Sequence, residues 1–302
     1  MVVVLAGGTG GAKLARGMLA VAGAERLCVI ANTADDVEAY GVHVSPDPDL
    51  VSYWLADLID ERGYGIRGDS WRVMEALEAA GRPAWFRLGD RDLAMCLIRT
   101  ERLRAGERPT TAQGAVTRAL GVRARVLPMS DEPVRTRVRS GGRTLPFQEF
   151  MILAGAARAI DGVELDGIGR ARPSPEVLAA IEAAEAIVIG PSNPIISIGP
   201  ILALEGMREA LAAARAPVVA VSPFVGGRAV KGPTDAFMTS AGLPLGADGV
   251  ARAYAGVIDG LVADEQAEGV RVLEAATLMD SQHARERVAA LTLELAASLA
   301  GP

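Results

Sequence analysis

The sequence predicts an α/β fold with a doubly wound, mostly parallel, Rossmann-like sheet. Short apolar runs alternate with amphipathic stretches of helical length, which is typical of parallel strands joined by crossover helices. The runs are rich in Val and Ile and are bounded by Gly, Pro or Ser, as expected of strands in a sheet that is covered on both faces. We therefore expect one central sheet with helices on both sides.

Four strands of this sheet are expected at Val2–Ala6, Leu27–Ala31, Ala186–Ile189 and Val218–Val221. The pattern changes between the second and third strands, where helices are expected near residues 51–60, 70–80, 91–104 and 111–120. We interpret this segment as a helical subdomain at about residues 50–122. It belongs to a single domain that spans residues 1–302.

Three further elements are predicted downstream. Val134–Arg139 and Arg143–Pro146 flank a pair of glycines, which indicates a β-hairpin. Ser174 offers an N-cap and Pro175 a first helical residue, so a helix should begin there. The last stretch, Arg285–Ala300, is rich in good helix formers and predicts a helix that covers the sheet.

The composition excludes several classes of protein. The 302 residues carry a formal charge of −6, which disfavours a general nucleic-acid binder. No stretch reaches the roughly 20 apolar residues of a membrane span, and the start lacks the pattern of a secretory leader. We therefore expect a cytoplasmic protein without a nucleic-acid or membrane partner. Cys28 and Cys96 lie in apolar patterns, so they are expected to be buried and not to form a disulfide or zinc site.

A glycine-rich loop follows the first strand directly and precedes a helix. Glycines let backbone amides approach an anion closely, and the helix N-terminus adds a partial positive charge. The loop lacks the GK[ST] ending of the Walker motif and the third glycine of the dinucleotide fingerprint. It favours phosphate binding over a turn without a ligand, although it does not name the nucleotide. The residues proposed to bind are Gly7, Gly8, Thr9, Gly10 and Lys13.

Acidic residues follow the second strand, where open α/β sheets bind ligands. Asn32 comes first, and Asp35 and Asp36 lie close behind it in the chain. Such carboxylates suit Mg²⁺, but Asp and Asn are equally common in turns that bind nothing. His43 and Asp49 belong to the next polar run, and His43 alone favours a structural hydrogen-bonding role over catalysis.

Three more polar loops complete the candidate site. The run 85–92 places Arg87 beside two aromatic residues, which suits a flat ring and an anion, although Asp90 capping a helix would explain it equally. Two later strands end in loops that carry a rigid polar segment and two cations. Their candidate residues are Ser192, Asn193, Pro194, Gly227 and Lys231. Convergence of such loops at strand ends is the strongest sign of one ligand cleft.

Read together, these runs resemble the 2-phospho-L-lactate transferase family, also called CofD or FbiA, of coenzyme F-420 biosynthesis. The order and spacing of the set are specific, although each run alone is not. The matching runs are GGTGGAK at 7–13, NTADD at 32–36, HVSPDPDL at 43–50, GDS at 68–70, LGDRD at 88–92, LPMSDEPVRT at 127–136, FQEF at 147–150, GPSNPIISIGPIL at 190–202 and VSPFVGGRAVKGP at 221–233.

The resemblance implies a Mg²⁺-dependent transferase. A 2-phospholactyl or enolpyruvyl-phosphate group would pass from a diphosphoguanosine carrier to the terminal ribityl hydroxyl of 7,8-didemethyl-8-hydroxy-5-deazariboflavin, and GMP would be released. Asp49 and Arg87 would contact the deazaflavin, and Asp49, Asp35 and Asp36 would be the catalytic carboxylates. The Gly7–Lys13 loop and the segment 192–194 would hold the carrier. Asp35 or Asp36 would bind the metal. We also expect a homodimer.

One departure concerns the donor. Residues 11–13 read Gly-Ala-Lys, where archaeal members of the family usually show Thr-Pro-Lys. This suggests a bacterial type, for which an enolpyruvyl carrier is implied, and the donor acid stays open.

Two other functions compete with the transferase. An NAD-dependent oxidoreductase would need an acidic residue at the end of the second strand, where the chain has Asn32 and Thr33. A non-catalytic nucleotide-binding regulator would be favoured by loss of the SPDPD and LGDRD runs, but both are present.

Overall fold

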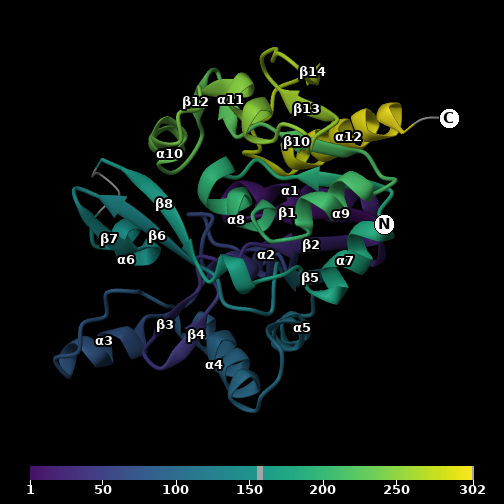
Figure 1. Ribbon diagram of the computed structural model, residues 1–302. Coiled ribbons are helices and arrows are strands. Elements are labelled where there is room, and N and C mark those ends of the chain that lie inside the picture. Colours follow the sequence, from purple (N-terminus) through teal and green to yellow (C-terminus); the bar gives the residue numbers. More distant parts are fainter. Residues whose placement is uncertain (155–158, 301–302) are drawn as a thin grey trace.

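In the computed structural model, which describes residues 1–154 and 159–300, a seven-stranded parallel sheet forms the centre (Figure 1). The predicted α/β fold class is confirmed, and the four predicted strands have the predicted bounds. The strand order is β14 (Arg271–Glu274), β13 (Gly260–Ala263), β10 (Val218–Val221), β9 (Ala186–Ile189), β1 (Val2–Ala6), β2 (Leu27–Ala31) and β5 (Arg125–Pro128).

Alternate side chains of the strands enter two separate cores, one on each face of the sheet. Val3 and Leu5 of β1 point into one core, while Val2 and Val4 point into the other. The first core is completed by α7 (Pro175–Glu182), α8 (Gly199–Leu202), α9 (Met207–Ala213) and α11 (Gly246–Ala253). The second is completed by α1 (Gly8–Ala22), α2 (Pro46–Leu55) and α12 (Gln282–Leu299). Both Cys28 and Cys96 are buried and free, as expected.

The chain between β2 and β5 is mostly helical and, in Figure 1, extends below the sheet. A short antiparallel pair, β3 (Val37–Ala39) and β4 (Val42–Val44), is followed by α2, α3 (Arg72–Ala79), α4 (Asp90–Arg104) and α5 (Pro109–Ala119). A helix lies at each of the four predicted places. However, α2 begins at Pro46 and not near Val51, because a proline is favourable in the first turn of a helix.

A second, antiparallel sheet follows β5. β6 (Arg135–Ser140) pairs with β7 (Arg143–Pro146) as the predicted hairpin, and β8 (Gly162–Asp166) pairs with the other edge of β6. The short helix α6 (Phe147–Ile152) continues directly from β7. The remaining short elements are a 3₁₀ turn at Ala24–Arg26, another at Ile168–Arg170, a π-turn at Pro194–Ile198, β11 (Phe224–Val225), β12 (Arg228–Ala229) and α10 (Thr234–Ser240).

Two predicted helix boundaries are confirmed. The Ser174 hydroxyl accepts a hydrogen bond of 3.3 Å from the amide of Val177 and so caps α7. The C-terminal helix α12 ends at Leu299 and packs along α1 and the sheet. Over residues 1–154 and 159–300, no helix is both long and apolar enough to cross a membrane.

The strand order reverses at β1. The chain proceeds from β1 to β2 and β5 on one side, and then returns to β9 and the later strands on the other side. Open α/β sheets bind ligands in the crevice at such a reversal, beyond the carboxyl ends of the strands. The glycine loop after β1 and the loop after β9 border this crevice.

Candidate functional site

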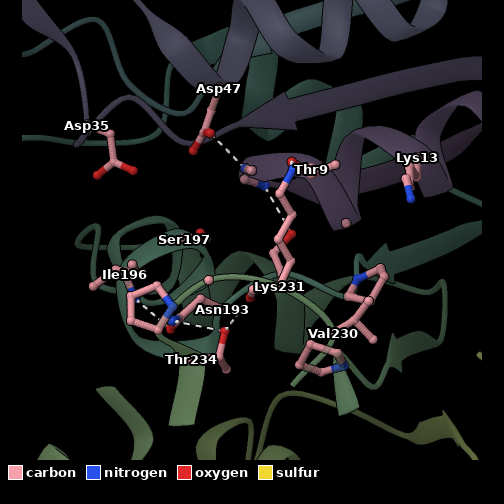
Figure 2. A pocket seen from close by; sticks show the side chains of 18 of the residues that line it. Thr9, Lys13, Asp35, Asp47, Asn193, Ile196, Ser197, Val230, Lys231 and Thr234 are labelled. Atoms are coloured by element: carbon pink, nitrogen blue, oxygen red, sulfur yellow. Dashed lines mark hydrogen bonds between the residues drawn. The ribbon is translucent and has the colours of Figure 1, made fainter. Parts of the chain in front are cut away.

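A cavity of about 310 Å³ lies beyond the carboxyl ends of β1 and β9 (Figure 2). Its size falls in the range of small-molecule sites, about 300–1,000 Å³. Loops that follow four strands of the sheet line it together with α6, so the predicted convergence occurs. We call it the donor cavity. Among its lining residues are Gly7, Gly8, Thr9, Gly10, Lys13, Asp35, Asp47, Gln148, Ser192, Asn193, Lys231 and Thr234.

The glycine loop packs directly on the loop after β9. A Cβ atom on Gly10 would lie 1.9 Å from the carbonyl oxygen of Pro191, and one on Gly11 would lie 2.7 Å from Oγ of Ser192. Gly190 in turn allows the backbone of Gly11 to approach. These glycines are therefore needed for contact between the two loops, in addition to the access to backbone amides that the sequence suggests.

Asp47 is a central acidic residue of the donor cavity, and it is not among the residues selected from the sequence. Its carboxylate accepts hydrogen bonds from the amide of Gly8 at 2.7 Å and from Nδ2 of Asn32 at 3.0 Å. The side chain is buried, and this burial raises its pKa to about 6. Asn32 itself does not line the cavity but holds Asp47 in place. The available signal was the position of Asp47 in the same run as Asp49.

Asp35 lines the same cavity on the same side as Asp47, as Figure 2 shows. Burial, followed by the charge of Asp47, raises the pKa of Asp35 well above its usual range. Its Oδ1 atom is buried and has no hydrogen-bond partner among the residues that the structure describes. Gln148 of α6 donates to the backbone carbonyl of Asp35 at 3.0 Å and so fixes this turn. An orphaned carboxylate oxygen beside a second carboxylate matches the ligands that Mg²⁺ prefers.

Asp36 faces away from the donor cavity. Its carboxylate accepts from Ser45 Oγ at 2.7 Å and lies 2.9 Å from Nε2 of His43. Both residues line a neighbouring cavity of about 250 Å³ together with Arg99. The two adjacent acids therefore differ, because the oxygens of Asp36 are already bonded. His43 has the structural hydrogen-bonding role that the sequence favoured.

Two lysines, Lys13 and Lys231, also line the donor cavity (Figure 2). Lys231 Nζ donates to Thr9 Oγ1 at 3.2 Å. Burial lowers the pKa of Lys13 and of Lys231, and the charge of Lys13 lowers that of Lys231 further. The first turn of α1 also leaves amides without intrahelical acceptors. An anion bound here would meet two cations and a helix N-terminus.

The loop after β9 is fixed by its own polar side chains. Asn193 accepts from the amides of Ile195 and Ile196 and donates to Thr234 Oγ1 at 3.4 Å. Ser192 accepts from the amide of Gly7 at 3.3 Å. Both residues line the donor cavity, but Pro194, which begins the π-turn, does not. Gly227 also lies elsewhere, in the turn between β11 and β12.

Arg87 lines a third cavity of about 390 Å³, which we call the acceptor cavity. Its other lining residues include Arg62, Tyr64, Trp71 and Asp92. The Arg87 guanidinium lies 5.3 Å from the centre of the Trp71 ring. Burial and the charge of Asp49 raise the pKa of Asp92 to about 7.

Asp49 lies behind Asp92, in α2, and lines neither cavity. Its carboxylate forms a buried, two-point ion pair with Arg99 of α4, and one of these hydrogen bonds measures 3.0 Å. Arg99 donates as well to Gln113 Oε1 at 2.9 Å. The structure thus brings Asp49 close to the acceptor cavity but engages its charge internally.

Comparison with known proteins identifies the family. The sequence matches the family described as 2-phospho-L-lactate transferase CofD over residues 2–297. The chain belongs to the CofD family. It is 43% identical over 288 residues to a phosphoenolpyruvate transferase of Kitasatospora aureofaciens, covering 91% of this chain and 88% of that protein. It is 37% identical over 302 residues to a 2-phospho-L-lactate transferase of Methanosarcina mazei, covering 97% and 99%.

Membership of the CofD family confirms both the predicted resemblance and the transferase class. A solved structure from the UPF0052 family of Bacillus halodurans is also similar. It has a TM-score of 0.64 and 19% identity, with 97% of this chain and 98% of that chain covered. At this identity the likeness concerns the fold alone.

Proposed function

We propose that this CofD-family protein transfers a three-carbon acid phosphate, lactyl or enolpyruvyl, from a diphosphoguanosine carrier to a deazaflavin alcohol in coenzyme F-420 biosynthesis. The observation that carries the proposal is the charge arrangement of the donor cavity. Asp35 and Asp47 line it together with Lys13 and Lys231. Two relatives named for the lactate and phosphoenolpyruvate transfers support the reaction type.

The acid pair fits a divalent metal. Asp35 offers a buried oxygen that no residue in the described part of the chain bonds, and Asp47, which lines the same cavity, is held by Gly8 and Asn32. Mg²⁺ is commonly bound by one or two carboxylates together with phosphate oxygens and water. Bound by Asp35 and Asp47, it would neutralise charge on the donor diphosphate. Asp36 is the poorer candidate because it lines the neighbouring cavity, not the donor cavity.

The remaining chemistry is positioning. The glycine loop, Lys13 and Lys231 would bind the diphosphate, with Thr9 fixing Lys231. The oxygen of the ribityl hydroxyl forms a bond to the phosphorus that carries the acid, and the bond from that phosphorus to the bridging oxygen breaks. GMP leaves with the bridging oxygen, and the hydroxyl proton passes to a carboxylate of the Asp35–Asp47 pair.

The acceptor cavity suits the flat deazaflavin. Trp71 and Tyr64 offer ring faces, and Arg87 offers a planar cation. The loop that carries Tyr64 also borders the donor cavity, because Gly63 lies against Thr9. The ribityl chain could therefore extend from one cavity to the other. Asp49 would affect the acceptor indirectly, through its contact with Asp92, or directly only if its ion pair with Arg99 opened.

The test is transfer with purified components. The protein is mixed with the deazaflavin precursor and, separately, lactyl and enolpyruvyl diphosphoguanosine in Mg²⁺, and products are read by mass spectrometry. We expect transfer from at least one donor and its loss in excess EDTA, with recovery on adding Mg²⁺ or Mn²⁺. No product from either donor would overturn the transferase proposal, and full turnover in EDTA would overturn the metal. The homodimer stays a prediction, to be measured by light scattering.

A further inference from the structure

Cations and aromatic rings alternate in a row that runs from the donor cavity to the acceptor cavity. The Lys231 ammonium lies 4.9 Å from the centre of the Tyr64 ring, and the Arg62 guanidinium lies 5.1 Å from the same ring. Arg62 is also 5.6 Å from the Trp71 ring, which Arg87 approaches to 5.3 Å. Lys231 lines the donor cavity and the other four residues line the acceptor cavity. We call this set the cation–ring row.

The Tyr64 side chain is held by the cations of the row more than by burial against other side chains. It is 54% exposed, and Tyr64 stands between Gly63 and Gly65, whose φ angles are 80° and 141°. Glycines restrain the backbone least. Asp60 closes this loop on both sides of Tyr64: its carboxylate accepts from the amide of Gly63 at 3.1 Å and from Nε of Arg62 at 2.7 Å, and its amide donates to the carbonyl of Gly65 at 2.9 Å. The loop backbone is thus held, whereas the exposed Tyr64 ring is oriented by the cations beside it.

The other end of the row depends on what occupies the donor cavity. Lys231 donates to Thr9, which belongs to the first turn of α1. An anion on this turn can accept from Lys231 in its present position. The nearby charge of Lys13 opposes that of Lys231, and a bound diphosphate would remove this repulsion. The Lys231 ammonium is thus held most firmly when the donor cavity is filled.

We propose that the cation–ring row couples the two cavities. A nucleoside diphosphate in the donor cavity fixes Lys231, and Lys231 then fixes Tyr64 against Arg62, so that the acceptor cavity is formed before the deazaflavin arrives. This inference rests on the proposed function, because it takes the two cavities as donor and acceptor sites. It predicts that the donor binds first. By linkage, each ligand must tighten the other by the same factor.

Fluorescence titration of the deazaflavin precursor, with and without saturating GDP in Mg²⁺, measures the coupling. An exposed cation–ring contact is worth only a modest free energy, so we expect GDP to tighten precursor binding by about two- to fivefold. Tyr64→Ala should reduce this ratio to about one. Tyr64→Phe keeps the ring and should keep the ratio. Leu97→Ala, an exposed position on α4 outside the row, is the matched control.

The ratio of precursor affinities with and without GDP distinguishes coupling through the row from a direct contact between Tyr64 and the precursor. If Tyr64→Ala weakens precursor binding equally with and without GDP, Tyr64 only touches the ligand and the row is refuted. A wild-type protein that binds both ligands without mutual effect refutes the row but leaves the proposed function intact. A wild-type protein that does not bind the precursor even with GDP refutes the proposed function itself.

Discussion

At the scale of single residues, Asp47 is a buried acid whose lost hydration is only partly replaced by hydrogen bonds from Gly8 and Asn32. Its pKa of about 6 lies above the ordinary value for Asp, about 3.9, so the folded protein holds its proton more tightly than the unfolded chain does. The stability that this group contributes is fully present below about pH 4 and is lost as the pH rises through about 6. Asp35, whose pKa is also raised, acts in the same direction.

The first prediction follows for Asp47→Asn. In the absence of metal, the melting temperature of the variant should fall less than that of wild type as the pH rises from 5 to 8, because Asn carries no buried charge to form. Mg²⁺ should stabilise the wild type above pH 6 but not the variant. Differential scanning fluorimetry measures both effects. Asp36→Asn is the control and should keep the response to Mg²⁺; loss of that response in the control but not in Asp47→Asn would reverse the metal assignment.

A second prediction concerns Asp49, which the family resemblance implied to be a catalytic carboxylate. The structure shows it paired with buried Arg99, so Asp49→Asn leaves a buried cation without its partner. Breaking such a pair typically costs about 3–5 kcal/mol, which denaturant unfolding would detect. Adding Arg99→Met should restore much of that loss. A stable Asp49→Asn protein with collapsed transfer would instead support the catalytic role.

At the scale of elements, the contact between the glycine loop and the loop after β9 supplies a third prediction. Gly10→Ala places a methyl group 1.9 Å from the carbonyl of Pro191, so the two loops must separate. We expect a loss of about 1–3 kcal/mol in stability and of most GDP affinity. Gly114→Ala, inside α5, is the control and should be neutral or stabilising by up to about 1 kcal/mol. Undiminished GDP binding by Gly10→Ala would mean that the loop contact does not shape the site.

Four strands of the central sheet were predicted from their apolar runs, whereas β5, β13 and β14 were not, for physical reasons. β5 and β14 lie at the two edges of the sheet, where fewer neighbours bury them, and both begin with Arg. β13 begins with Gly260, where a Cβ atom would lie 2.8 Å from Leu299 and 3.0 Å from Leu295 of α12. Because α12 is distant in the sequence, its close packing on Gly260 leaves no pattern in the residues around β13 from which the strand could be predicted. β8 pairs across a long connection and likewise escaped prediction.

The candidate site was predictable to the level of loops but not of side chains. Asp35 and Asp36 are neighbours in the chain, yet a turn directs them into different cavities. The spacing of the two acids does not show which carboxylate is hydrogen-bonded within the fold. That depends on His43 of β4 and on Ser45, which follows β4 and contacts Asp36. Asp47 was missed for the same reason, since its burial comes from contact with α1.

At the scale of the whole molecule, the sheet should select a guanine nucleotide carrier over a dinucleotide. The end of β2, where dinucleotide-binding enzymes place an acid for the ribose, carries Asn32, and its amide is engaged with Asp47. We therefore predict tighter binding of GDP than of NAD. Isothermal calorimetry in Mg²⁺ compares them directly, with ADP as a test of the base. Tighter binding of NAD would show that the crevice binds dinucleotides in preference to GDP.

The buried charges of the donor cavity should also make the stability of this protein depend on the concentration of the small molecules that bind there. A ligand that binds only the folded state stabilises it in proportion to the logarithm of its concentration. Because Asp35, Asp47, Lys13 and Lys231 all lose solvation in the fold, the empty protein gives up stability that a charged ligand returns. We therefore expect the protein without such a ligand to unfold more often, and to be degraded faster in a cell, than the protein with a charged ligand bound.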